Sequence, residues 1–173
     1  MFVKKGKRMF TKLAPLALAI ALGVLAGERP AHAATVVALG ASNTFGKGVS
    51  RDQAYPAQLA ARLRARGIDV GVANAGINGD TTGGMLARLD RAVSKDTRVV
   101  LLQPGGNDQR KGASDETSAI RDRLNARGIR VVMVPNRMFA GKPHQSDGVH
   151  LTPEGYRLLA EQLVDDVAGA LAR

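Results

Sequence analysis

The sequence predicts an α/β fold, a three-layer α/β/α sandwich built around a parallel, flavodoxin-like sheet of four to five strands. Short runs rich in valine and leucine alternate with amphipathic segments from residue 34 to the end of the chain. These runs are continuously apolar, which is typical of parallel strands covered by helices on both faces. With 173 residues, 45% hydrophobic and 23% charged, the chain is long enough for one domain with a sizeable core.

The strands and helices are expected to alternate. Apolar runs predict strands at residues 35–39, 69–73, 98–103 and 129–134. Helical spacing of apolar residues predicts helices at 56–66, 82–93, 114–127 and 152–171. Ser114 is expected to open the third helix, and Thr152 with Pro153 is expected to open the last.

Residues 1–33 have the features of a secretory signal peptide. A basic stretch precedes the apolar run Leu13–Ala26, and a small-residue site, Ala31-His32-Ala33, follows it. The apolar run has 14 residues, fewer than the ~20 that span a bilayer. We therefore expect cleavage after Ala33, a mature domain of residues 34–173, no stable membrane anchor, and a periplasmic or secreted location. An uncleaved anchor is the alternative.

The composition argues against several classes of function. Residues 1–33 carry half of the net charge of +10, and the remaining basic residues are dispersed among acids along the predicted helices. Dispersed charge and 3% aromatics without tryptophan argue against a nucleic-acid partner. The absence of cysteine excludes disulfides, a cysteine nucleophile and thiolate metal sites. The sequence carries no signal for an oligomeric state.

A reactive side chain or a glycine-rich turn follows each predicted strand. Ser42 follows the first, Gly79 the second and Asn107 the third, and Asp147 and His150 come after the fourth. The carboxyl ends of parallel strands meet at one edge of a sheet, so these groups should gather there. A hydroxyl, glycine amides, an amide side chain, a carboxylate and an imidazole are the parts of an acyl-transfer site.

Each of these residues has an expected role. Ser42 is the candidate nucleophile, which needs a base to take its proton. His150 is the candidate base, and Asp147, three residues earlier, can orient one ring nitrogen while the other faces Ser42. The backbone N–H groups of Ser42 and Gly79 and the side chain of Asn107 are candidate oxyanion donors. Each motif alone could be a cap or a turn, and their joint occurrence supports the functional interpretation.

Four segments resemble, in order, the sequence blocks of the SGNH/GDSL hydrolase superfamily. They are GASNTFGKGV, NAGINGDTTGGML, QPGGND and DGVHLTPEGY, and the resemblance spans about residues 35–165. It is closest to the bacterial branch of arylesterases, acyl-CoA thioesterase I and lysophospholipase-like enzymes. The resemblance implies Ser42 as nucleophile, Gly79 and Asn107 as oxyanion donors, and Asp147 and His150 as the other catalytic residues. It also implies a small-molecule ester substrate and no cofactor or metal.

Two features depart from the family pattern. Ala41 stands where the family usually has aspartate, next to Ser42. The stretch between Asn107 and Asp147 is short, so that a helix and the usual fifth strand are missing. This region helps to wall the acyl pocket in relatives. We therefore expect a smaller, more open site that favours short acyl groups.

Three other functions fit parts of the sequence. His144, Asp147 and His150 are spaced three apart and could bind a metal, although proline and glycine around them indicate a loop. Residues 40–48 resemble a phosphate-binding loop, but the glycine spacing is one residue too long and Lys47 is not followed by serine or threonine. A binding protein that has kept the fold and lost turnover is the third.

Overall fold

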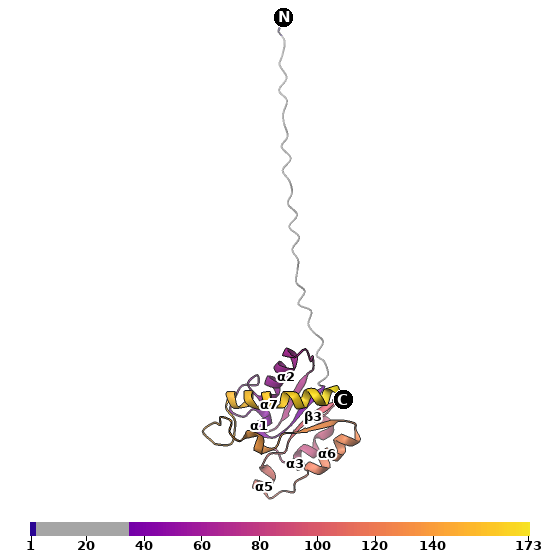
Figure 1. The fold of residues 1–173 in the computed structure, drawn as a ribbon, viewed down its shortest axis with the longest axis vertical. Coiled ribbons are helices and arrows are strands. Elements are labelled where there is room, and N and C mark those ends of the chain that lie inside the picture. Colours follow the sequence, from indigo (N-terminus) through magenta and orange to yellow (C-terminus); the bar gives the residue numbers. More distant parts are fainter. Residues whose placement is uncertain (3–34) are drawn as a thin grey trace.

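The computed structural model describes residues 1–2 and 35–173 and has the predicted α/β sandwich architecture (Figure 1). Four parallel strands form its sheet in the order β2-β1-β3-β4. They are β1 (Val36–Gly40), β2 (Val72–Gly76), β3 (Val99–Gln103) and β4 (Arg130–Met133). Within the described residues no fifth strand joins the sheet, so β2 and β4 are its edges.

Helices cover both faces of the sheet. On one face lie α2 (Tyr55–Ala65) and α7 (Pro153–Ala172), and on the other lie α3 (Thr82–Ala87), α4 (Leu89–Ala92) and α6 (Thr117–Ala126). Alternate residues of β1 and β3, the two central strands, pack into two hydrophobic cores, one on each face of the sheet. Val36 and Leu101 pack towards α2 and α7, whereas Val37 and Leu102 pack towards α3, α4 and α6. Burial on both sides explains why these strands are continuously apolar.

Three short elements at the carboxyl edge of the sheet were not predicted. They are α1 (Ser42–Phe45), α5 (Asn107–Lys111) and the 3₁₀ helix η1 (Asn136–Phe139). Elements of four or five residues are too short to show a helical periodicity in sequence. Two of them matter for the site, because Ser42 and Asn107 are the first residues of α1 and α5.

The second predicted strand was placed three residues too early. In the structure β2 ends at Gly76, which pairs with Gly40 of β1. A side chain at Gly76 would put its Cβ 2.2 Å from the backbone nitrogen of Phe45. Residue 76 must be a glycine because α1 lies directly against it. This glycine made the end of the strand look like a loop in the sequence.

Of the four predicted helices, the two middle ones were wrong in their details, whereas the first and the last were confirmed to within one residue at each end. The helix predicted at 82–93 breaks at Arg88, whose φ and ψ of −106° and 8° leave α3 and α4 separate. The third begins at Thr117 rather than at Ser114, and the hydroxyl of Thr82 accepts the N–H of Glu116 at 2.7 Å. At α7, Thr152 caps the helix as expected, with its hydroxyl accepting the N–H of residue 155 at 3.2 Å.

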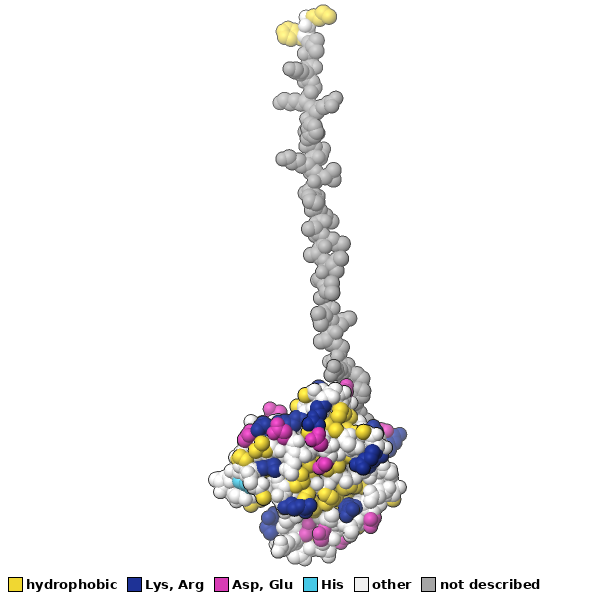
Figure 2. All heavy atoms as spheres, viewed as in Figure 1, with side chains coloured by type: hydrophobic (Ala, Val, Ile, Leu, Met, Phe, Trp, Pro, Cys, Tyr) yellow, Lys and Arg dark blue, Asp and Glu magenta, His cyan; other side chains and the backbone are white. Residues whose placement is uncertain are grey.

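Basic and acidic side chains are interspersed on the face drawn in Figure 2, which agrees with the dispersed charge of the sequence. Within the described part of the chain, no helix has both the length and the apolar character needed to cross a bilayer. Apart from Met1 and Phe2, the predicted signal peptide lies outside the described residues.

Candidate active site

The groups predicted at the strand ends gather at the carboxyl edge of the sheet. Ser42 follows β1, whose neighbours β2 and β3 lie on opposite sides of it, and ligands bind at such a switch point in parallel sheets. A cavity of about 340 Å³ opens here. Ser42 and Asn107 both line it.

Ser42, His150 and Asp147 form a continuous chain of hydrogen bonds. The Nε2 atom of His150 lies 2.9 Å from Oγ of Ser42, and its Nδ1 atom lies 2.5 Å from Oδ2 of Asp147. The side chain of His150 is buried, with 8% exposed, whereas that of Asp147 is 45% exposed. This geometry can move a proton from the serine hydroxyl to the imidazole.

The carboxylate of Asp147 is fixed by the backbone of its own loop. Its Oδ1 atom accepts the N–H groups of His150 and Val149, both at 2.9 Å. The backbone bond from His150, followed by the bond from its ring and that from Val149, holds the pKa of Asp147 well below its usual range. An ionised carboxylate favours the proton on Nδ1 of His150, which leaves Nε2 free to accept the proton of Ser42.

Asn43 connects the nucleophile to the loop that carries the base. Its Nδ2 donates to the carbonyl of Val149 at 3.1 Å, and its Oδ1 accepts the N–H of Leu151 at 3.4 Å. Val149 and Leu151 flank His150, and Asn43 directly follows Ser42 in α1. The same turn therefore presents the hydroxyl and anchors the imidazole. The sequence prediction missed Asn43, because nothing in the chain marks a contact across more than 100 residues.

The three candidate oxyanion donors differ in their surroundings. Among the described residues, the backbone N–H groups of Ser42 and Gly79 donate to no protein group. Gly79 has a φ of +73°, a left-handed conformation that favours glycine, and it is not among the residues lining the cavity. Asn107 is 5% exposed and its Nδ2 donates to the carbonyl of Asp80 at 2.6 Å. An amide nitrogen carries two hydrogens, so one remains to face the cavity.

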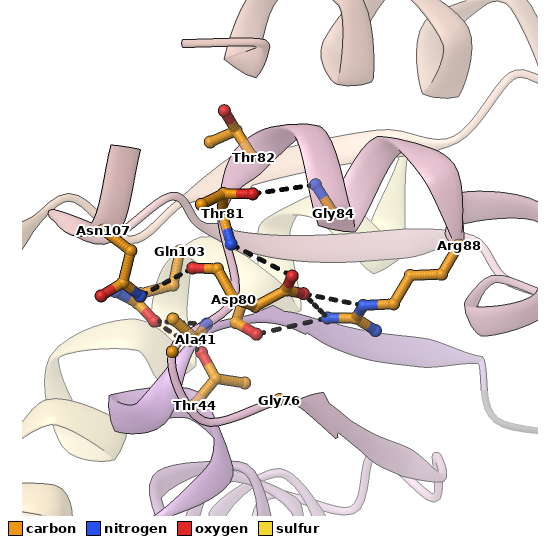
Figure 3. Close-up of polar contacts among 12 residues, drawn as sticks. Ala41, Thr44, Gly76, Asp80, Thr81, Thr82, Gly84, Arg88, Gln103 and Asn107 are labelled. Carbon is orange, nitrogen blue, oxygen red and sulfur yellow. Dashed lines mark hydrogen bonds and ion pairs between the residues drawn. The ribbon is translucent and has the colours of Figure 1, made fainter. Parts of the chain in front are cut away.

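A buried ion pair joins the loops that carry these donors (Figure 3). Both Nε and Nη2 of Arg88 lie 2.8 Å from Oδ2 of Asp80, and the two side chains are 10% and 11% exposed. Nη2 of Arg88 also donates to the carbonyl of Gly40 at 3.3 Å, just before the nucleophile turn. Asp80 directly follows Gly79, and the carbonyl of Asp80 accepts a hydrogen bond from the side chain of Asn107. The ion pair therefore contacts the segments that carry Ser42, Gly79 and Asn107.

Gly84 lets α3 approach the carboxylate of Asp80. A Cβ at Gly84 would lie 2.1 Å from Oδ1 of Asp80, whereas a Cβ at the neighbouring Gly83 would have no atom nearer than 3.9 Å. Asp80 lies in one of the family-like segments, but its sequence context predicts no role for it or for Arg88. An acid and a base eight residues apart form no recognisable motif, so no sequence signal could have found the pair.

The nucleophile turn is supported by Gln103 (Figure 3). The N–H of Ala41 donates to Oε1 of Gln103 at 3.0 Å, and the hydroxyl of Thr44 donates to the same atom at 3.1 Å. Gln103 is 2% exposed and Ala41 is likewise buried. With Ala41 in place of the usual aspartate, the turn still brings Ser42 within hydrogen-bond distance of His150.

The structure gives the metal alternative no support. Nδ1 of His144 hydrogen-bonds the carbonyl of Lys142 at 2.7 Å, and the imidazole of His150 is engaged by Ser42 and Asp147. Throughout the described part of the chain, no three His, Cys, Asp or Glu side chains are placed to hold one ion.

The sequence of this chain is similar to those of two esterases. The chain is 30% identical over 125 residues to Esterase TesA of Pseudomonas aeruginosa, covering 69% of this chain and 62% of the relative. It is 32% identical over 109 residues to an arylesterase of Vibrio mimicus, covering 60% of this chain and 54% of the relative. The matches thus span somewhat more than half the length of these relatives.

Solved structures share the fold. The crystal structure of TesA superposes with a TM-score of 0.67 at 22% identity, covering 78% of this chain and 98% of that chain. The psychrotrophic esterase EstA from Pseudoalteromonas sp. gives 0.69 at 19% identity, covering 80% and 98%. AlinE4, an SGNH-hydrolase family esterase, gives 0.57 at 26% identity, covering 80% and 96%.

The family match begins inside β1 and covers most of the domain. Residues 38–146 match the GDSL-like Lipase/Acylhydrolase family, and the match ends just before Asp147 and His150. The placement of those two residues beside Ser42 therefore comes from the structure. Because the match covers more than half of the chain, the protein belongs to the GDSL-like lipase/acylhydrolase family.

Proposed function

We propose that this protein is a serine hydrolase of small carboxylic esters that works through an acyl-enzyme on Ser42. The observation that carries the proposal is the unbroken chain of hydrogen bonds from Ser42 through His150 to Asp147, at the edge of a cavity that Asn107 also lines. Membership in a family of lipases and acylhydrolases supports it.

The proposed reaction begins with attack of Oγ of Ser42 on the ester carbonyl. His150 takes the serine proton on Nε2, and the carboxylate of Asp147 stabilises the imidazolium that forms. The carbonyl oxygen becomes an oxyanion, to which Asn107 and the N–H groups of Ser42 and Gly79 donate. His150 then protonates the departing alcohol, and water releases the acid in the same sequence of steps.

Asp80 and Arg88 act as positioning residues in this proposal. They touch no reacting atom, but they tie the segments of Ser42, Gly79 and Asn107 together through one buried ion pair. Oxyanion donors must lie within a few tenths of an ångström of the developing charge to stabilise it fully. Loosening the pair should therefore weaken transition-state stabilisation while leaving the proton transfer to His150 intact.

The cavity supports a preference for short acyl groups. Its volume of about 340 Å³ lies near the lower end of small-molecule sites. Its apolar lining is limited to Ala41, Phe139, Ala140 and Val149, beside several polar side chains. A long acyl chain would leave most of its carbons in water, and each unburied CH₂ forgoes about 0.8 kcal/mol of binding.

Active-site labelling and a series of esters test the proposed function. A fluorophosphonate probe should label the wild-type protein and fail to label Ser42→Ala. Nitrophenyl esters from acetyl to decanoyl should be hydrolysed with a kcat/KM that peaks at short chains. Absence of label on the folded wild-type protein would favour a binding protein without turnover, and rates that rise steadily to decanoyl would contradict the short-acyl preference.

We also propose that the enzyme is exported and that residues 1–33 are removed. The support is the succession of basic, apolar and small-residue segments in the sequence. Expression in a bacterial host, followed by fractionation and mass measurement, should recover a periplasmic or secreted chain that begins at Ala34. Recovery of the full-length chain in the membrane fraction would show an uncleaved anchor instead.

A further inference from the structure

An exposed arginine without an acidic partner lines the cavity beside the candidate oxyanion donors. Arg110 is on α5, one helical turn after Asn107, and it lines the same cavity as Ser42. Its Nη2 atom donates to Oδ1 of Asn107. Its Nη1 atom lies 3.8 Å from where a Cβ at Gly106 would sit. The guanidinium therefore lies next to the amide that is proposed to donate to the oxyanion.

The charge of Arg110 is not balanced by the protein. Within the described residues Arg110 forms no ion pair with an acidic side chain, in contrast to Arg88, which is paired with Asp80 on the other side of Asn107. None of the residues that line the cavity is acidic. A guanidinium has five N–H donors, and Asn107 accepts from one nitrogen only, so the others are available to a ligand.

We propose that Arg110 selects esters that carry an anionic group, a carboxylate or a phosphate, close to the scissile carbonyl. The inference rests on the proposed hydrolase function of this same site. A planar guanidinium binds a carboxylate or phosphate through two parallel hydrogen bonds, and it stays charged at every working pH. A site next to Asn107 places the anionic group within a few atoms of the carbonyl carbon. Such a substrate is short and charged, which matches a small, half-polar cavity.

The anion could belong to the acyl group or to the alcohol, and two pairs of substrates distinguish these sources. Nitrophenyl hemisuccinate against nitrophenyl methyl succinate tests the acyl side, because the terminal carboxylate of the first is replaced by a neutral methyl ester in the second. Carboxy-nitrophenyl acetate against nitrophenyl acetate tests the alcohol side. In each pair the measured quantity is the ratio of kcat/KM for the anionic ester to that for the neutral ester.

Arg110→Gln should lower this ratio about tenfold or more on one of the two sides, because a hydrogen bond to a charged group is lost. Arg110→Lys should keep part of the preference. Arg121→Gln, which removes an equal charge from an exposed position on α6, should leave the ratio unchanged. Equal losses on anionic and neutral esters in Arg110→Gln would mean that Arg110 acts only through Asn107, and the proposal would be overturned.

Binding without turnover separates this inference from the proposed function. Ser42→Ala and Ser42→Ala/Arg110→Gln can be titrated calorimetrically with the same ester pairs. The single variant should bind one anionic ester more tightly than its neutral partner, and the double variant should lose that difference. Equal affinities in the single variant would overturn the inference even if the wild-type enzyme hydrolyses neutral esters. Failure of the wild type on every ester would contradict the hydrolase proposal, and the binding difference would still decide the role of Arg110.

Discussion

The two sides of the candidate active site are built in opposite ways. The proton-transfer side depends on a loop in which Asp147 bonds its own near neighbours, including the backbone N–H and ring of His150, and its carboxylate is nearly half exposed. The oxyanion side depends on the buried pair of Asp80 and Arg88, which ties together segments from three strand ends. The first side concentrates its function in single side chains, and the second distributes it. Single substitutions on the proton-transfer side should therefore nearly abolish kcat, whereas those on the oxyanion side should lower kcat by graded amounts.

The largest effect is expected from His150→Ala. Without the imidazole no group takes the proton of Ser42, so kcat for nitrophenyl acetate should fall by about 10⁴-fold or more. An unchanged circular-dichroism spectrum is the control for folding, because the ring of His150 is buried. A loss of less than about tenfold would show that His150 is not the base.

Asn107→Ala measures the oxyanion side directly. Loss of one oxyanion donor should lower kcat by about 10²–10³-fold, with little change in KM. Asn125→Ala is a matched control, because it makes the same change at an exposed position on α6. Similar losses in both variants would contradict a specific contribution from Asn107.

Arg88→Met tests whether the oxyanion side depends on its buried pair. Asp80 would be left as an unpaired buried carboxylate, which costs about 3–5 kcal/mol of stability, and the donors should shift from their positions. We expect kcat to fall by roughly ten- to a hundredfold at a temperature where the variant remains folded, a smaller loss than removing Asn107 itself.

The exposed pair between Arg123 and Asp90 provides the control. Both side chains are more than half exposed, so Arg123→Met should change stability by no more than about 1 kcal/mol and leave kcat unaltered. Arg88→Lys should restore part of the activity, because one charged bond to Asp80 can re-form. If Arg88→Met lowers stability but not kcat, the pair supports the fold alone.

The same contrast explains which residues of the site could be predicted from the sequence. The fold class, the four strands and the convergence of Ser42, Asn107, Asp147 and His150 at one edge of the sheet could be predicted, since each follows a strand and parallel strand ends converge. Asp80, Arg88 and Asn43 could not, because their partners are distant in sequence and their motifs are ordinary. The break at Arg88 was missed for the same reason: helical periodicity continues across it, while the contact with Asp80 is visible only in three dimensions.

Alanine substitutions at two adjacent glycines of α3 should have smaller effects on kcat, and only one of them should disturb Asp80. Gly84→Ala would push against Oδ1 of Asp80 and should lower kcat several-fold by disturbing the pair with Arg88. Gly83→Ala adds the same methyl group where there is room, and it should leave kcat unchanged and stabilise α3 by about 0.5–1 kcal/mol. Kinetics and urea unfolding of the two variants, measured together, separate the effect on Asp80 from the effect on helix propensity. Equal kcat values would show that the carboxylate can move without consequence.

The smallest expected effect concerns the pH dependence of the proton-transfer side. Hydrogen bonds from His150 and Val149 hold the pKa of Asp147 below that of an unfolded aspartate, which is about 3.9. The native state therefore binds fewer protons than the unfolded state, and the stability from this carboxylate is present above pH ~4 and is lost as the pH falls through the lower native pKa.

Urea unfolding of wild type and Asp147→Asn from pH 7 to pH 3 checks this sign. The difference in free energy of unfolding should be constant from pH 7 to about 5 and should shrink below about 4, since only the wild type loses a charged acceptor there. Asp122→Asn, an exposed change on α6, gives the background of a lost surface charge. A difference that grows as the pH falls from 7 to 5 would mean that the native pKa of Asp147 lies near neutrality, because the native state would then bind more protons than the unfolded state. The loop would then be coupled to the catalytic pH range, and the proton-transfer side would be less locally determined than its hydrogen bonds indicate.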